Sequence, residues 1–221
     1  MNDFKEQRDR MVDEQIAARG VRDPAVLEAM RAVPRELFVA EGLREFAYAD
    51  EPSPIEHDQT ISQPFVVAAM IEAVRPRPGE RALEIGTGSG YAAAVLAKIV
   101  GEVYTVERLA GLVESARGRL AALGYANVHV RHANGTLGWS EHAPYDVIIV
   151  TAGGPKVPQP LLDQLAVGGR LIMPVGSWRI GQHLVRVTRA GEDRYDHEDL
   201  EPVAFVPLIG QEGWKLGEDR A

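Results

Sequence analysis

Glycine and acidic residues occur in this chain in an order that suits a nucleotide. Residues 83–90 read Leu-Glu-Ile-Gly-Thr-Gly-Ser-Gly, and Glu107 follows a second apolar run at residues 103–106. This order predicts a buried strand, a tight turn, a helix and a second strand that ends in an acid. A carboxylate at such a strand end accepts hydrogen bonds from the hydroxyl groups of a ribose. We therefore expect a nucleoside to bind between the turn and Glu107.

The spacing of the glycines indicates which nucleotide is bound. Dinucleotide-binding turns carry G-x-G-x-x-G, which seats a pyrophosphate at a helix N-terminus. In this chain Gly86, Gly88 and Gly90 form G-x-G-x-G instead, a turn that suits an adenosine ligand without a pyrophosphate. S-adenosyl-L-methionine fits that description, and a nicotinamide dinucleotide does not. The alternative, a tight turn that binds nothing, is less consistent with the strand and helix patterns on both sides.

Alternating apolar runs and helical patterns from residue 81 onward position these residues. The predicted strands are 81–86, 102–107, 127–131, 145–151 and 170–175, and the predicted helices are 90–100, 109–123 and 158–166. Such alternation favours a mostly parallel sheet with helices on both faces, which is a Rossmann-like α/β fold. Two final strands, 183–187 and 203–206, are expected to lie antiparallel at one edge.

The first part of the chain is predicted to be helical around a long loop. Helices are expected over residues 4–18 and 24–32, the second with Asp23 as its N-cap. Residues 44–60 contain prolines and polar groups with little periodicity, and a further helix is expected at 65–74. A loop of that length in a compact domain usually has a function.

The residues at the carboxyl ends of the predicted strands form one expected surface. In open α/β sheets the ligand lies beyond these ends. They hold the glycine turn, Glu107, Asn134-Gly135 and residues 151–154. The amide oxygen of Asn134 is a suitable acceptor for the exocyclic amine of adenine.

Composition and charge bound the remaining functions. The 221 residues are expected to form one domain, with helices and a substrate loop in 1–78, a cofactor-binding core in 79–177 and strands in 178–221. The net charge of −8 argues against a nucleic-acid partner. The chain has no cysteine, and its six histidines lack metal-binding spacing, so no metal is expected. A charged N-terminus and the lack of a long apolar run predict a cytoplasmic protein without a membrane segment.

One segment upstream of the glycine turn is more specific. Residues 58–64 read Asp-Gln-Thr-Ile-Ser-Gln-Pro and resemble the Q-T-I-S-x-P signature of the protein-L-isoaspartate O-methyltransferase family. Further similar segments follow in the same order over nearly the whole chain: residues 47–52, the glycine turn, 143–146, 168–176 and the Phe-Val-Pro-Leu run at 205–208. The turn is generic among methyltransferases, whereas Thr-Ile-Ser and Phe-Val-Pro-Leu are specific to this family.

The resemblance implies the fold and the activity of that family. The fold would be the Rossmann-like class I methyltransferase fold, with an N-terminal helical extension and antiparallel C-terminal edge strands. The reaction would move a methyl group from S-adenosyl-L-methionine to the free carboxylate of L-isoaspartyl residues in damaged proteins and peptides, leaving S-adenosyl-L-homocysteine. The ester then collapses to a succinimide, and hydrolysis returns some normal aspartate. A monomer is expected, because a repair enzyme must admit segments of many proteins.

The resemblance also implies roles for individual residues. The active serine of the family falls on Ser62, and Thr60 and Ile61 beside it are expected to contact the substrate. His57, which precedes this segment, is a further candidate for substrate contact. The expected cofactor contacts are Gln59, Thr60, Ile61, Ser62, Glu84, Gly86, Thr87, Gly88, Ser89, Gly90, Glu107, Arg108, Asn134 and Gly135.

The reaction is compatible with so small a set of polar groups. A carboxylate has an unperturbed pKa of about 4, so at neutral pH it is already a nucleophile and needs no general base. The protein has to align oxygen, methyl and sulfur, which contributes about 7–11 kcal/mol in favourable cases. We therefore predict that Ser62 aims the carboxylate through a hydrogen bond and keeps its own proton. On spacing alone, Ser62 could instead cap the helix that follows Pro64.

Two positions depart from the family pattern and leave alternatives open. Glu56-His57-Asp58 replaces a glycine-containing segment, which puts two acids near a site for an anion and removes backbone freedom. Ala133-Asn134-Gly135 replaces Gly-Asp-Gly, which costs energy if residue 133 needs a positive φ. The alternatives are a carboxyl methyltransferase that acts on an aspartate of a dedicated peptide, and a homologue that binds without turnover.

Overall fold

A seven-stranded sheet forms the centre of the structure, a computed structural model that describes residues 4–177 and 179–217. The strand order is β5-β4-β3-β6-β7-β8-β9. The strands are β3 (Arg81–Ile85), β4 (Glu102–Glu107), β5 (Val128–His132), β6 (Tyr145–Val150), β7 (Leu165–Ser177), β8 (Gly181–Arg189) and β9 (Tyr195–Val203). Neighbours from β5 to β7 are parallel, and β8 and β9 are antiparallel. The predicted mostly parallel sheet with an antiparallel edge is confirmed.

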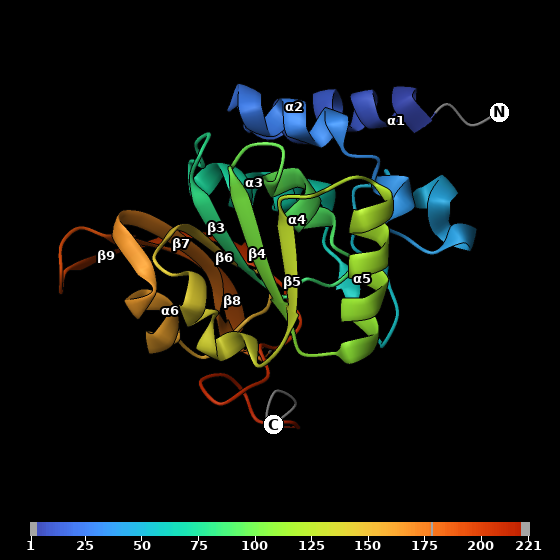
Figure 1. Cartoon of the computed structure of the whole chain (residues 1–221). Helices are drawn as coiled ribbons and strands as arrows, with labels where there is room; N and C mark the ends of the chain where they lie inside the picture. The colour runs from blue at the N-terminus through green and yellow to red at the C-terminus, as the bar shows by residue number, and fades with distance from the viewer. Residues whose placement is uncertain (1–3, 178, 218–221) are drawn as a thin grey trace.

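Helices cover both faces of the sheet (Figure 1). One face packs against α3 (Pro64–Ala73), α4 (Tyr91–Leu96) and α5 (Ala110–Ala122), and the other against α6 (Gln159–Asp163) and the 3-10 turns η5 (Gly135–Leu137) and η6 (Ser140–His142). Successive residues of a strand pack on opposite faces of the sheet. Ala82 belongs to the hydrophobic core that contains α4, and Leu83 belongs to the core that contains α6. Because both faces are apolar, β6 is a nearly uninterrupted apolar run.

The N-terminal helices lie across one end of the sheet (Figure 1). α2 (Pro24–Ala32) is capped by the Asp23 carboxylate, which accepts from two backbone N–H groups of the first turn, and it contacts α3 and α4. The helix predicted over 4–18 is divided into α1 (Phe4–Arg10), the π-helical turn η1 (Met11–Ile16) and the 3-10 turn η2 (Ala17–Arg19). Gly20, with φ of 108°, ends this segment.

Two predictions near the end of the sheet differ from the structure. The helix predicted over 158–166 shortens to α6, because Leu165 already pairs with Tyr145 as the first residue of β7. The strand predicted over 203–206 is wrong, since β9 ends at Val203 and residues 204–206 form no strand. β9 lies at the sheet edge with mostly exposed side chains on both faces, so its sequence has no apolar alternation that could reveal a strand.

The loop predicted over 44–60 contains short elements. η4 (Glu41–Phe46) precedes β1 (Ser53–Pro54) and β2 (Thr60–Ile61), and these two strands pair antiparallel. The backbone N–H of Ile55 donates to the carbonyl of Gln59 at 2.9 Å and closes the turn between them. Residues 53–61 are called the hairpin below.

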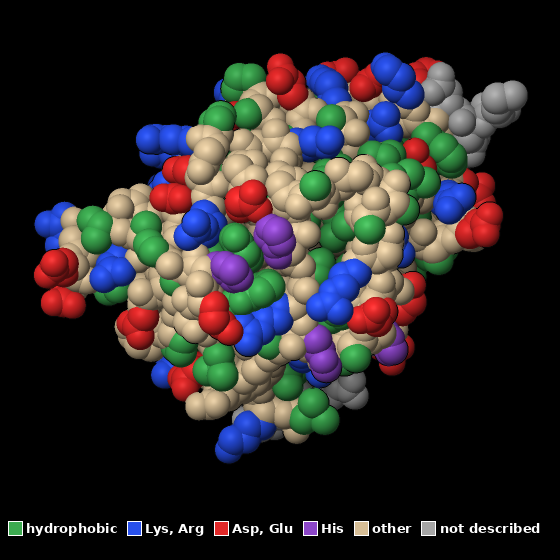
Figure 2. All heavy atoms as spheres, viewed as in Figure 1, with side chains coloured by type: hydrophobic (Ala, Val, Ile, Leu, Met, Phe, Trp, Pro, Cys, Tyr) green, Lys and Arg blue, Asp and Glu red, His purple; other side chains and the backbone are tan. Residues whose placement is uncertain are grey.

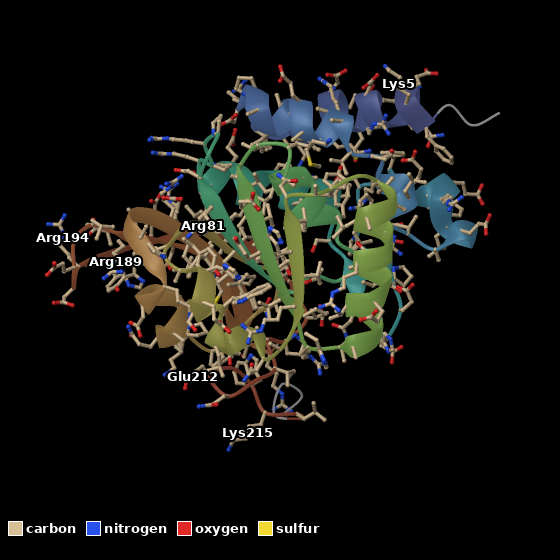
Figure 3. All side chains as sticks on the ribbon, in the orientation of Figure 1. Lys5, Arg81, Arg189, Arg194, Glu212 and Lys215 are labelled. Atoms are coloured by element: carbon tan, nitrogen blue, oxygen red, sulfur yellow. The ribbon has the colours of Figure 1, made fainter. Side chains whose placement is uncertain are left out.

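Charged side chains cover the outside of the molecule. On the face seen in Figure 2, basic and acidic groups are interspersed, and Lys5, Arg194 and Lys215 lie at the periphery (Figure 3). None of the helices in 4–177 and 179–217 is both long enough and apolar enough to cross a membrane.

Candidate active site

The glycine turn joins β3 to α4 at the carboxyl edge of the sheet. Gly86, Gly88 and Gly90 have φ of 97°, 52° and 90°, in the left-handed region that other residues avoid. A Cβ on Gly86 would lie 2.4 Å from Oγ1 of Thr151, which directly follows β6. Thr151 Oγ1 donates to the carbonyl of Gly86 at 2.9 Å and holds the turn against β6. The G-x-G-x-G spacing therefore follows from backbone positions that glycine adopts without strain.

Glu107, at the end of β4, faces the same turn. Its Oε2 accepts from the backbone N–H of Gly88 at 3.0 Å, and its Oε1 accepts from the backbone N–H of Leu109 at 3.0 Å. The side chain is buried, so these two amides balance much of the cost of removing the carboxylate from water. Each oxygen retains a further lone pair for a ligand hydroxyl. The predicted ribose contact stays a prediction, and this geometry leaves a lone pair on each oxygen for it.

Two adjoining cavities lie on either side of the turn. The larger, of about 520 Å³, is lined by the turn, residues 60–63, Tyr91 and residues 201–206. The smaller, of about 70 Å³, is lined by Glu107, Arg108, Gly135 and neighbouring apolar residues. The residues that line both are Thr60, Gly86, Gly88, Thr151 and Val206. The arrangement suits an elongated ligand with its nucleoside beside Glu107 and its other end in the larger cavity.

The smaller cavity by itself supplies only part of the space that a nucleoside needs. Ligand pockets commonly measure about 300–1,000 Å³, against about 70 Å³ beside Glu107. Gln59 and Thr60 of the hairpin form one wall, and residues 206–209 form another. A nucleoside beside Glu107 would therefore also occupy the space that the smaller cavity shares with the larger one.

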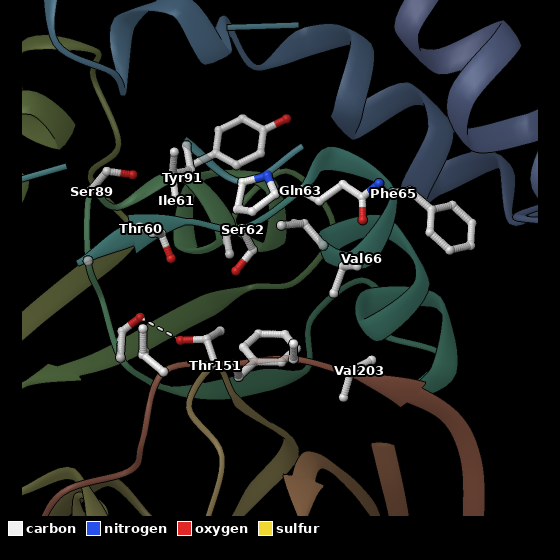
Figure 4. Close-up of a pocket in the computed structure, with 18 of the residues that line it drawn as sticks. Thr60, Ile61, Ser62, Gln63, Phe65, Val66, Ser89, Tyr91, Thr151 and Val203 are labelled. Atoms are coloured by element: carbon white, nitrogen blue, oxygen red, sulfur yellow. Dashed lines mark hydrogen bonds between the residues drawn. The ribbon is translucent and has the colours of Figure 1, made fainter. Parts of the chain in front are cut away.

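Ser62 reaches the larger cavity from the segment between β2 and α3. The hydroxyls of Thr60 and Ser62 point into this cavity, opposite Thr151 and Val203 (Figure 4). α3 begins at Pro64 with Gln63 as its N-cap and without a side-chain cap hydrogen bond. Ser62 is therefore not the helix cap, and its hydroxyl is available to a ligand.

A buried carboxyl group lies on the floor of the larger cavity. Glu84 is fully buried, and its Oε2 accepts from Thr105 Oγ1 at 2.5 Å. Oγ1 of Thr105 is in turn 2.6 Å from Oγ1 of Thr87. The other oxygen, Oε1, has no hydrogen-bond partner within the described residues. Burial, and to a lesser degree the charge of Glu107, raise the pKa of Glu84 to about 8.

Comparison with known proteins assigns the chain to a family. The family model described as Protein-L-isoaspartate(D-aspartate) O-methyltransferase matches residues 6–213. The chain belongs to this family. It is 61% identical over 207 residues to Protein-L-isoaspartate O-methyltransferase 2 of Pelobacter propionicus, covering 94% of this chain and 92% of that protein. It is also 61% identical over 211 residues to Protein-L-isoaspartate O-methyltransferase 1 of Rhodopseudomonas palustris. That match covers 96% of this chain and 86% of that protein.

Solved structures agree with this family and with its fold. A protein-L-isoaspartate O-methyltransferase superposes with a TM-score of 0.85 at 30% identity, over 95% of this chain and 67% of that one. A Plasmodium falciparum protein described as a protein-L-isoaspartate O-methyltransferase, solved in complex with S-adenosyl-L-homocysteine, superposes with a TM-score of 0.78 at 27% identity. That match covers 91% of this chain and 98% of that one. Together with the strand order, these similarities confirm the predicted class I methyltransferase fold.

Most of the residues that the family resemblance singled out meet at the two cavities. Those that line a cavity are Gln59, Thr60, Ile61, Ser62, Glu84, Gly86, Thr87, Gly88, Ser89, Glu107, Arg108 and Gly135. Gly90 lies outside both. It is the N-cap of α4, and a Cβ on it would lie 3.3 Å from Cδ1 of Leu120 in α5. Its φ of 90° and this close packing account for glycine at this position without a ligand.

Two of the residues predicted to contact a ligand have neighbours within the protein. The imidazole of His57 lies against Gly111 at the start of α5, so close that a Cβ there would meet Nε2 at 2.2 Å, and His57 does not line the larger cavity. The amide oxygen of Asn134 accepts from the backbone N–H of Thr136 at 3.1 Å and from its hydroxyl at 2.9 Å. That oxygen therefore caps η5, and the predicted contact with an adenine stays a prediction.

The structure also resolves the departures from the family pattern. His57 and Asp58 have φ of 60° and 56°, so this turn does use the conformation that glycine supplies most easily. Ala133 is not among the residues with positive φ, and its substitution for glycine causes no backbone strain. Neither Glu56 nor Asp58 lines the larger cavity, so their charges do not face the place where Ser62 would receive an anion.

Other residues of the site could not be found from the sequence. Arg19, from the N-terminal segment, lines the larger cavity with its guanidinium 3.6 Å from the Phe65 ring centroid and 2.9 Å from Asp50. The strip Glu201 to Val206 forms the opposite wall. Phe-Val-Pro-Leu at 205–208 marked part of this strip by resemblance, whereas no local pattern marked Arg19.

Proposed function

We propose that this protein transfers the methyl group of S-adenosyl-L-methionine to the free carboxylate of L-isoaspartyl residues in damaged proteins and peptides. The transfer leaves S-adenosyl-L-homocysteine and starts repair through a succinimide. The observation that carries the proposal is that the Ser62 hydroxyl and the glycine turn face one cavity, which adjoins Glu107. The family and the ligand of the Plasmodium falciparum relative support the same reaction. We also propose that the protein acts as a monomer in the cytoplasm.

Three features of the chain fit the donor. The glycine turn allows close backbone approach, and Glu107 offers a lone pair on each oxygen to ribose hydroxyls. Glu84 Oε1, buried and without a partner in the described part of the chain, lines the larger cavity and suits the donor's amino group. When bound, the donor supplies an electrophilic methyl group on a sulfonium.

Ser62 is proposed to orient the acceptor. Its hydroxyl donates to one oxygen of the isoaspartyl carboxylate, and the other oxygen then faces the methyl group. The apolar walls at Ile61, Phe65 and Val203 exclude water from the attacking oxygen. No proton has to be removed, because the carboxylate is ionised at neutral pH. The site therefore needs alignment rather than a base, which accounts for its few polar groups.

Chromatography of one peptide tests the whole proposed sequence. An isoaspartyl peptide is incubated with the protein and S-adenosyl-L-methionine, and the succinimide and the aspartyl peptide are quantified over time. The succinimide should appear first and the aspartyl peptide should follow from it as the isoaspartyl peptide disappears, and only when the donor is present. A folded protein that binds the donor but leaves the peptide unchanged would contradict the proposed function.

A further inference from the structure

Arg35 is a buried cation behind the Ser62 segment. It lies in the 3-10 turn η3 (Arg35–Leu37) after α2, and none of its surface is exposed. Burial lowers the pKa of its guanidinium from the ordinary value. A buried charge is costly unless its hydrogen bonds offset the loss of water, so its partners indicate what it does.

The guanidinium joins the two ends of the segment that holds the hairpin. Its Nε donates to the carbonyl of Ala47 at 2.8 Å, and its Nη2 donates to the carbonyl of Ser62 at 2.8 Å. Its central carbon lies 4.8 Å from the ring centroid of Tyr91, which lines the larger cavity. One planar group thus fixes the base of residues 47–62 and the backbone of Ser62.

These contacts are not those of a stabilising ion pair. Within residues 4–177 and 179–217, no carboxylate forms a salt bridge with Arg35, and its Nη1 has no partner. The adjacent Glu36 instead accepts from the Tyr48 hydroxyl and lies 3.7 Å from Arg8. For stability alone, an apolar side chain of similar volume often serves as well as a buried charge. The geometry therefore favours a role in positioning.

We infer that Arg35 is a positioning residue for methyl transfer, which holds the Ser62 carbonyl so that the Ser62 hydroxyl is aimed at the acceptor carboxylate. This inference rests on the proposed function. Arg35 does not line either cavity of the site, so it acts through Ser62 and not by contact with a ligand. A lysine cannot replace it, because one ammonium group lacks the rigid fork that reaches both carbonyls.

A double-mutant cycle separates positioning from general support of the fold. Arg35→Lys is compared with the parent protein in the wild-type background and in Ser62→Ala, with kcat measured on an isoaspartyl peptide at saturating donor. We expect Arg35→Lys to lower kcat about 20-fold when Ser62 is present and less than about twofold in Ser62→Ala. Donor affinity, measured by calorimetry, should stay within about threefold.

Arg170 provides a control that likewise joins two backbone carbonyls and differs from Arg35 in its ion pair with Glu80 at 3.0 Å. Its Nε donates to the carbonyl of Val74 at 2.7 Å and its Nη2 to that of Arg75 at 2.6 Å, and it lines neither cavity of the site. Arg170→Lys should lower the free energy of unfolding and leave kcat within about twofold. If Arg35→Lys does not fold, Arg35→Gln, whose amide still donates to one carbonyl, is taken through the same cycle.

The outcomes separate this inference from the proposed function. If Arg35→Lys lowers kcat by the same factor with and without Ser62, the proposed role of Arg35 is overturned, because its effect would not pass through Ser62. A wild-type protein that binds the donor but methylates no isoaspartyl peptide would overturn the proposed function instead. A fall in kcat only in the background that contains Ser62 supports both the role of Arg35 and the proposed function.

Discussion

Replacing Glu84 with glutamine should change how the stability of the ligand-free protein depends on pH. Glu84 is fully buried, its Oε1 is unpaired within the described residues, and burial raises its pKa from 4.5 to about 8. In the unfolded chain the carboxyl regains its ordinary pKa. Between these two values unfolding releases a proton from Glu84, and the free energy of unfolding therefore falls as pH rises.

The size of the effect follows from the two pKa values. The contribution of Glu84 is fully present below pH 4.5 and is lost as pH rises to about 8. At about 1.4 kcal/mol per pH unit, the interval from 4.5 to about 8 amounts to about 5 kcal/mol at most. Glutamine has a similar shape, accepts from Thr105 Oγ1 in the same way and does not titrate. The variant therefore removes only the pH dependence that Glu84 gives to the free energy of unfolding.

Urea unfolding of both proteins, from about pH 5 to about pH 8.5, measures the effect. Groups that do not interact with residue 84 titrate alike in the two proteins, so the difference between their free energies of unfolding reports Glu84 and its interaction with Glu107. That difference should move by several kcal/mol in favour of Glu84→Gln as pH rises. A difference that does not depend on pH would refute the assignment of a raised pKa to this carboxyl.

Three further substitutions test the site. Gly86→Ala should abolish donor binding, measured by calorimetry, and cost about 1–3 kcal/mol of stability, measured by urea unfolding, because its Cβ would collide with Thr151 Oγ1. The control Gly118→Ala, at a helical position with open space, should be neutral or stabilising. Equal effects of the two substitutions on donor binding and stability would contradict this explanation. Glu107→Gln should raise the dissociation constant of S-adenosyl-L-homocysteine about 10-fold or more, and unchanged binding by calorimetry would remove the ribose contact. His57→Ala should leave kcat and the peptide KM within about twofold, because its ring lies on Gly111; a large rise in peptide KM would show that it contacts the substrate.

The glycine turn and Glu107 could be predicted because local chemistry determines them. Positive φ at alternate positions of the turn favours glycine there. An acidic residue at the end of the following strand is the pattern by which this fold binds a ribose. The order of strands and helices was predictable for a similar reason, since strands buried on both faces are continuous apolar runs.

Other parts of the site depend on contacts that no local pattern records. Asn134 carried the right chemistry for adenine, but Thr136, two residues later, takes up its oxygen. His57 lies beside the signature segment, yet a glycine on α5 provides the notch that holds its ring. Arg19 and Arg35 reach the site from the N-terminal segment through tertiary packing alone. β9 was missed because an edge strand with two solvated faces has no apolar period.

The most direct test of the proposed function compares two peptides that differ at one residue. One contains an L-isoaspartyl linkage, the other contains aspartate at the same position, and the formation of S-adenosyl-L-homocysteine is measured for each at saturating donor. We predict at least one equivalent of S-adenosyl-L-homocysteine per isoaspartyl peptide and none above background with its aspartyl twin. Equal turnover of both peptides, or none with the isoaspartyl peptide by a folded protein that binds the donor, would contradict the account.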